Sequence, residues 1–112
     1  MYKQQFVISK KNKSSNLGDF KSVKLFLDFT LYYQKESQLN IVKNNICEIY
    51  ILGELFDAKH PKNTNSQIVS SMDTINSFKE FSQRISIYYG RFVAIYITPK
   101  NQEFLIINDA CS

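Results

Sequence analysis

Alternation of apolar and polar residues is clearest over residues 23–32, where every second side chain is apolar. A period of two predicts a β-strand with one strongly apolar face. The apolar run 4–9 predicts an earlier short strand, and residues 38–42 predict a strand that returns after a polar turn. The apolar face of the alternating stretch consists of Val23, Leu25, Leu27, Phe29 and Leu31.

Two later stretches are apolar almost without interruption. Residues 46–56, "ICEIYILGELF", are typical of a strand in the middle of a sheet. Residues 88–98 and 103–109 flank the turn 99–102 and predict a hairpin whose first strand is apolar on both faces. We therefore expect another sheet or a partner chain to cover the second face. One face carries Phe92, Ala94 and Tyr96, and the other carries Val93, Ile95 and Ile97.

Two helices are predicted between these strands. Thr64 and Gln67 have the spacing of a capping box, which predicts a helix start within residues 63–72. Residues 75–86 place apolar side chains at helical spacing, and core packing explains that stripe better than a partner groove. The stripe consists of Ile75, Phe78, Phe81 and Ile85. Strands, then two helices, then two strands predict a single α+β domain over residues 1–112, mainly antiparallel.

The net charge of +4 is concentrated near the start of the chain. Residues 1–25 hold six Lys against one Asp, and the stretch 9–16, "SKKNKSSN", could meet phosphate. Only two of the fourteen basic residues are Arg, and the stretch 10–16, "KKNKSSN", contains no aromatic residue, so a solvated loop is favoured over a nucleic-acid partner. No apolar run approaches the roughly 20 residues of a membrane span, and no signal peptide is evident. We expect a cytoplasmic protein without a membrane partner.

Candidate chemistry is sparse. His60 precedes a proline in a polar loop, which favours solvent exposure, and Cys47 looks like a buried, inert thiol within a strand. Cys47 and Cys111 are expected to be reduced. Glu48 and Glu54 would share a strand face about 20 Å apart, too far for a paired acid and base. Glu54 with Asp57 stays open, although a solvated rim is commoner. The residues thus predict no catalytic set, no metal site and no cofactor.

The order of three segments resembles the N-terminal glutamine amidotransferase domain of the asparagine synthetase family. "LGELFD" (52–57) stands where that family has an Asn-Gly-Glu turn, and "TNSQIV" (64–69) where it has a Ser-Asp-Thr-Glu helix start. "GRFVAIY" (90–96) matches its Gly-x-Phe strand, and "NDACS" (108–112) its Asp-Arg-x-Gly ending. The resemblance covers residues 46–112 and implies a partial Ntn-hydrolase-like sandwich of two sheets between helical layers.

The resemblance also implies that the chemistry is lost. The family's nucleophile is a Cys at position 2, where this chain has Tyr2. Leu52 replaces the Asn that holds the oxyanion, and Asn65 replaces the Asp that binds the substrate's amino group. Gly53 and Glu54 remain, so a residual ligand pocket would consist of Gly53, Glu54 and Asn65.

Three functions follow from these observations. The first is a non-catalytic amidotransferase-like scaffold or recognition domain, which packs on an ATP-dependent amide-forming synthetase domain or on a copy of itself. The second is the N-terminal fragment of an ammonia-using asparagine-synthetase-like enzyme. The third is a small interaction protein unrelated to that family.

Overall fold

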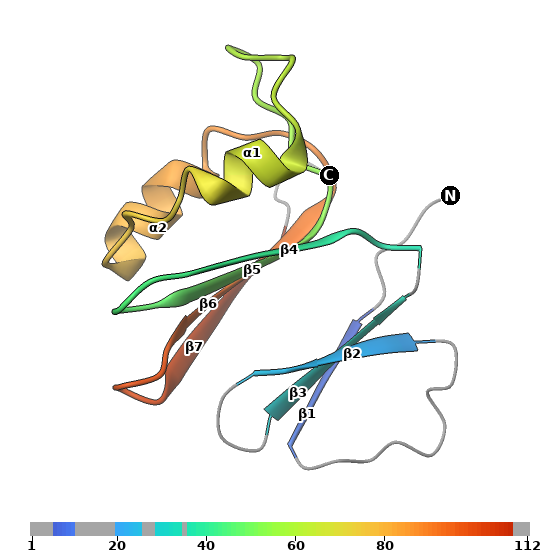
Figure 1. The fold of residues 1–112 in the computed structure, drawn as a ribbon, viewed down its shortest axis with the longest axis vertical. Helices are drawn as coiled ribbons and strands as arrows, with labels where there is room; N and C mark the ends of the chain where they lie inside the picture. The colour runs from blue at the N-terminus through green and yellow to red at the C-terminus, as the bar shows by residue number, and fades with distance from the viewer. Residues whose placement is uncertain (1–5, 11–19, 26–28, 35, 109–112) are drawn as a thin grey trace. The chain divides into compact units, whose positions relative to one another are not determined.

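Two antiparallel sheets are formed by separate parts of the chain (Figure 1). The computed structural model describes residues 6–10, 20–25, 29–34 and 36–108. The chain divides into two units, Met1–Gln38 and Leu39–Ser112, which are described in turn. The α+β class and the antiparallel pairing predicted from the sequence are confirmed.

The first unit is a three-stranded sheet. Strands β1 (Phe6–Lys10), β2 (Phe20–Lys24) and β3 (Phe29–Gln34) are arranged in the order β1-β3-β2. Leu31, in the central strand β3, is completely buried.

The prediction of one continuous strand over residues 23–32 is wrong. The stretch is divided between β2 and β3, which pair with each other, and the Leu25 amide donates to the Phe29 carbonyl at 2.9 Å. Val23 lies opposite Leu31, and opposed residues of antiparallel strands share a face. Because both numbers are odd, the alternation continues through the reversal, and the pattern of period two cannot reveal it.

The second unit contains a four-stranded sheet in the order β4-β5-β6-β7. The central strand and the hairpin predicted from the sequence are confirmed, with shorter bounds. The hairpin turns at residues 99–102. The four strands are β4 (Leu39–Lys43), β5 (Glu48–Gly53), β6 (Phe92–Thr98) and β7 (Glu103–Asn108).

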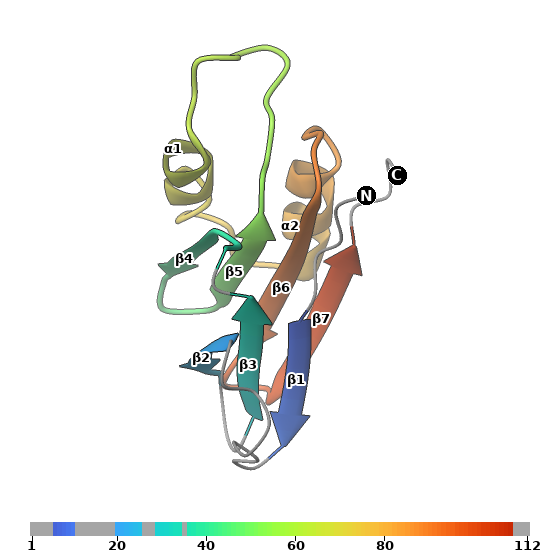
Figure 2. The ribbon, with the colours of Figure 1, turned by 90° about the vertical axis from the view of Figure 1, so that its right-hand side faces the viewer.

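Both helices lie on one face of this sheet, as Figures 1 and 2 show. The capping box at α1 (Asn65–Ser70) is confirmed: the Thr64 hydroxyl accepts from the Gln67 amide at 3.2 Å, and the Gln67 side chain accepts from the Thr64 amide at 2.8 Å. The second helix, α2 (Phe78–Ile85), begins later than predicted, because the Ser77 hydroxyl caps it by accepting from the Glu80 amide at 3.1 Å.

The core fills the space between the helices and the sheet. Phe81 and Ile85 of the predicted helical stripe are buried in it, and Ile75 is buried just before α2 begins. Phe78 departs from the prediction, since 39% of it is exposed. On the other face of β6, Val93, Ile95 and Ile97 are buried too, which confirms that both faces of this strand are covered. The cluster under the helices also includes Cys47, Ile49, Ile51, Leu55, Ile68, Val69, Met72, Tyr88, Phe92, Ala94 and Tyr96.

Candidate functional site

The three residues of the predicted residual pocket meet at the junction between β5 and α1. Although Asn65 is the first residue of α1, its side chain points back to the end of the strand. Its Nδ2 donates to the Gly53 carbonyl at 3.1 Å, and its Oδ1 accepts from the Leu55 amide at 3.0 Å. Glu54 lies between these contacts with its side chain exposed. The side-chain amide of Asn65 therefore joins the start of α1 to the backbone at the end of β5 by two hydrogen bonds.

The two residues before β6 contact the same junction. The Glu54 amide donates to the Arg91 carbonyl at 2.9 Å. Gly90 has a φ of +123°, and a Cβ placed on it would lie 2.2 Å from the Glu54 carbonyl oxygen. Only glycine allows both this backbone conformation and this close approach. Gly90 of the Gly-x-Phe segment thus allows the backbone to pass close to Glu54, a role that the sequence pattern alone does not reveal.

The chemistry of the junction is limited by these contacts. Leu52 is completely buried and lies opposite Val93, and its side chain has no donor for a developing oxyanion. Both ends of the Asn65 amide bind backbone groups. Tyr2 lies outside the described residues. The arrangement favours a structural function for the junction over a catalytic one.

His60 and Asp57 form a local contact in the loop after β5. His60 Nδ1 lies 3.3 Å from Asp57 Oδ2, and 69% of the His60 side chain is exposed, as predicted. Desolvation slightly raises the pKa of the Asp57 carboxyl, but hydrogen bonds from the Lys59 amide and the His60 ring outweigh it, so this pKa lies below its usual value. Asp57 thus pairs with His60. The other candidate carboxylate, Glu48, accepts a hydrogen bond from the Tyr50 hydroxyl at 2.9 Å.

Cys47 lies just before β5 and is 1% exposed, so its predicted burial is confirmed. Its Sγ donates to the Ile75 carbonyl at 3.3 Å. Burial raises the pKa of this thiol, which keeps it protonated at neutral pH. Within the described residues no three His, Cys, Asp or Glu side chains gather as metal ligands. Cys111 and most of the lysine-rich stretch lie outside those residues.

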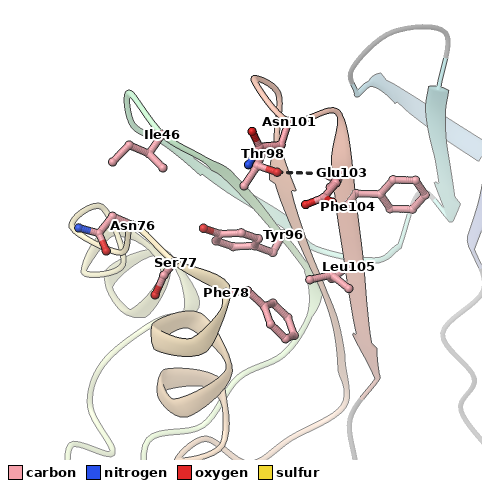
Figure 3. Close-up of a pocket in the computed structure, with 10 residues that line it drawn as sticks. All are labelled: Ile46, Asn76, Ser77, Phe78, Tyr96, Thr98, Asn101, Glu103, Phe104 and Leu105. Atoms are coloured by element: carbon pink, nitrogen blue, oxygen red, sulfur yellow. Dashed lines mark hydrogen bonds between the residues drawn. The ribbon is translucent and has the colours of Figure 1, made fainter.

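A pocket of about 230 Å³ opens at the opposite end of the sheet, where α2 begins and the β6–β7 hairpin extends beyond it (Figure 3). Its floor is formed by the cross-strand pairs Tyr96–Leu105 and Thr98–Glu103. The residues before α2 form one wall. The lining consists of Ile46, Asn76, Ser77, Phe78, Tyr96, Thr98, Asn101, Glu103, Phe104 and Leu105.

Tyr96 is the unusual group in this pocket. It is 2% exposed, and its hydroxyl interacts with the Cys47 thiol but makes no hydrogen bond of ordinary distance and angle. Burial raises the pKa of Tyr96 to about 12, with further contributions from the nearby Cys47 thiol and Glu80 carboxylate. Sequence reasoning treated Tyr96 as a core position. The available signal was the phenol itself, because the hydroxyl of a buried tyrosine normally has a hydrogen-bond partner.

Comparison of the chain with protein-family models, curated proteins and solved structures finds no match. No helix within the described parts of the chain is long and apolar enough to cross a membrane; α1 and α2 have six and eight residues.

Proposed function

We propose that the chain is a non-catalytic recognition domain with an amidotransferase-like frame, and that it associates with a second copy of itself through β7. The observation that carries this proposal is the apolar outer edge of β7. This strand ends the sheet order, and its outer edge pairs with no strand among the described residues. Unpaired backbone groups on such an edge are a template for another strand.

The sequence of β7, "EFLIIN", lacks the devices that usually protect an edge. It contains no Lys and no Pro, and its neighbouring residues Leu105 and Ile106 are 42% and 40% exposed. Successive residues point to opposite faces, so the edge is apolar on both. The other edge of the sheet differs, because α1 packs against β4 and Lys43 ends that strand.

A second copy fits this edge by symmetry. Two β7 strands related by a twofold axis perpendicular to the sheet would pair antiparallel, with either Leu105 or Ile106 opposite its own counterpart. The two sheets of four would then join into one continuous sheet with all helices on the same face. Exposed side chains of β7 would become cross-strand pairs, which stabilise a sheet.

The order of the elements supports the amidotransferase-like frame. A buried strand ends at Gly53, a capped helix follows, and a strand beginning after Gly90 leads into a hairpin. In this proposal the four-stranded sheet corresponds to one sheet of an Ntn-hydrolase sandwich. A synthetase-like ATP-binding domain is the alternative occupant of the β7 edge.

Sedimentation equilibrium tests the self-association. We expect the wild-type chain to form a dimer at about 100 µM, and Ile106→Lys to leave a monomer, because a lysine on an edge strand prevents pairing. Ile87→Lys is the matched control, since Ile87 is 53% exposed and lies outside the strands. A wild-type chain that stays monomeric, or two lysine variants that behave alike, would refute self-association through β7.

A glutaminase assay tests the non-catalytic part separately. We expect no ammonia release from glutamine above background, because Leu52 offers no oxyanion donor and the Asn65 amide binds the backbone. Activity that thiol alkylation abolishes would overturn this part of the proposal. A dimer without glutaminase activity agrees with the proposal as a whole.

A further inference from the structure

The geometry of the pocket at the start of α2 points to a ligand class. We propose that it binds a small organic cation, an ammonium or methylated ammonium group on a short apolar stem. The pocket volume of about 230 Å³ is below the usual range for drug-sized ligands. It therefore suits a small molecule or a single side chain.

The charge of the lining favours a cation. Glu103 is the one charged residue among the ten that line the pocket, and its side chain is exposed. Within the described residues no Lys or Arg forms an ion pair with it. The Glu80 carboxylate lies at the adjoining wall, where it accepts from the Asn76 amide at 3.2 Å. A ligand cation would thus meet an unpaired carboxylate and no positive side chain in the lining.

The start of α2 does not offer an anion site in competition. The Ser77 hydroxyl already accepts from the Glu80 amide. The Glu80 carboxylate accepts from the amide of Asn76, the residue before the Ser77 cap. These two contacts take the place that an anion would need at a helix N-terminus.

Aromatic rings supply the second element of a cation site. The rings of Phe78 and Tyr96 are 6.1 Å apart at 65°, which is an edge contact, and the Tyr96 ring also packs on Phe81 at 5.0 Å. Figure 3 shows the Glu103 side chain on the same side of the hairpin as Tyr96, with the Phe104 ring turned away. Because Tyr96 is 2% exposed, the 39% exposed Phe78 ring is the aromatic surface that a cation can reach, and a neighbouring carboxylate adds to the attraction of that ring for the cation.

The remaining lining suits an apolar stem with a polar end. Ile46 is 49% exposed and Leu105 is 42% exposed, and both border the pocket. In Figure 3 the Tyr96 hydroxyl points toward Asn76, Ser77 and Ile46. A hydroxyl or carbonyl on the ligand would give this buried group a stronger oxygen or nitrogen partner in addition to the neighbouring Cys47 thiol.

Titration of the ¹⁵N-labelled chain with choline tests the proposal by NMR. We expect saturable shifts of the amides of residues 76–78 and 103–105, with a Kd on the order of millimolar for so few contacts. The uncharged isostere 3,3-dimethylbutanol should bind at least about fivefold more weakly, because it keeps the shape and loses the charge. Saturable binding with this preference supports the site.

Variants connect the binding to the proposed groups. Glu103→Gln should weaken choline binding about two- to fivefold, as expected for an exposed charge pair, and Phe78→Leu should weaken it similarly. Glu54→Gln is the matched control, since it removes an exposed carboxylate at the other end of the sheet. The proposal fails if choline produces no saturable shift, if the isostere binds equally well, or if Glu103→Gln binds like Glu54→Gln.

A further arm distinguishes the source of the cation. A short peptide with a trimethyl-lysine that binds more tightly than choline identifies a partner's side chain, while tighter binding of choline identifies a free small molecule. Both results support the site. The proposal does not depend on self-association: Ile106 lies on the opposite face of β7 from Leu105, so the Ile106→Lys variant should still bind choline.

Discussion

Asn44, in the turn between β4 and β5, joins two parts of the second unit that are far apart in sequence. Its Nδ2 donates to the carbonyls of Asp73 at 2.9 Å and Ile75 at 2.7 Å, between the two helices. Its Oδ1 accepts from the amides of Ile46 at 2.8 Å and Cys47 at 2.9 Å. We therefore expect Asn44→Ala to destabilise the chain.

The magnitude follows from the surroundings of the four hydrogen bonds. Those to Asp73 and Ile46 are exposed, and water can replace them at little cost. Those to Ile75 and Cys47 are partly buried, and truncation would leave the Cys47 amide without a partner and the Ile75 carbonyl with only the weaker bond from the Cys47 thiol. At about 1–1.5 kcal/mol for each of these two, Asn44→Ala should lower the free energy of unfolding by about 2–3 kcal/mol.

Urea denaturation followed by circular dichroism measures this change. Asn45→Ala is a close control, because it removes the same side chain from an exposed position next to Asn44. Its free energy of unfolding should stay within about 0.5 kcal/mol of the wild-type value. If Asn44→Ala unfolds at the same urea concentration as Asn45→Ala, the role assigned to these hydrogen bonds is refuted.

Three further results are expected. Gly90→Ala should lower the free energy of unfolding by about 3 kcal/mol or more in urea denaturation, because its Cβ would collide with the Glu54 carbonyl at a positive φ; a smaller loss would contradict that geometry. In a Cys111→Ser background, Cys47 should react with a thiol reagent at pH 8 only after unfolding, and rapid labelling of the native chain would disprove its burial. Because the pKa of Tyr96 is raised to about 12, its contribution to stability should be complete below about pH 10 and fall between about pH 10 and 12; Tyr96→Phe should reduce that fall in pH-dependent denaturation, and an unchanged fall would argue against the shift.

Local patterns in the sequence predicted the elements whose causes are local. The capping box of Thr64 and Gln67 correctly places the start of α1, because its hydrogen bonds span three residues. The two-faced apolar stretch around Tyr96 correctly predicts a strand buried on both faces. The start of α2 was predicted too early, because apolar spacing extends to Ile75 while the Ser77 cap sets where the helix begins.

The tertiary structure decided what depends on contacts between distant residues. The reversal between Val23 and Leu31 leaves no trace in the alternation, because residues of the same parity face each other. Asn65 was predicted to belong to a ligand pocket, and folding places its amide against the backbone of Gly53 and Leu55. The pocket beside Tyr96 exists only where the start of α2 meets the hairpin, so no short segment could indicate it. Periodicity and caps act over a few residues, whereas cavities and long-range hydrogen bonds arise when the elements pack.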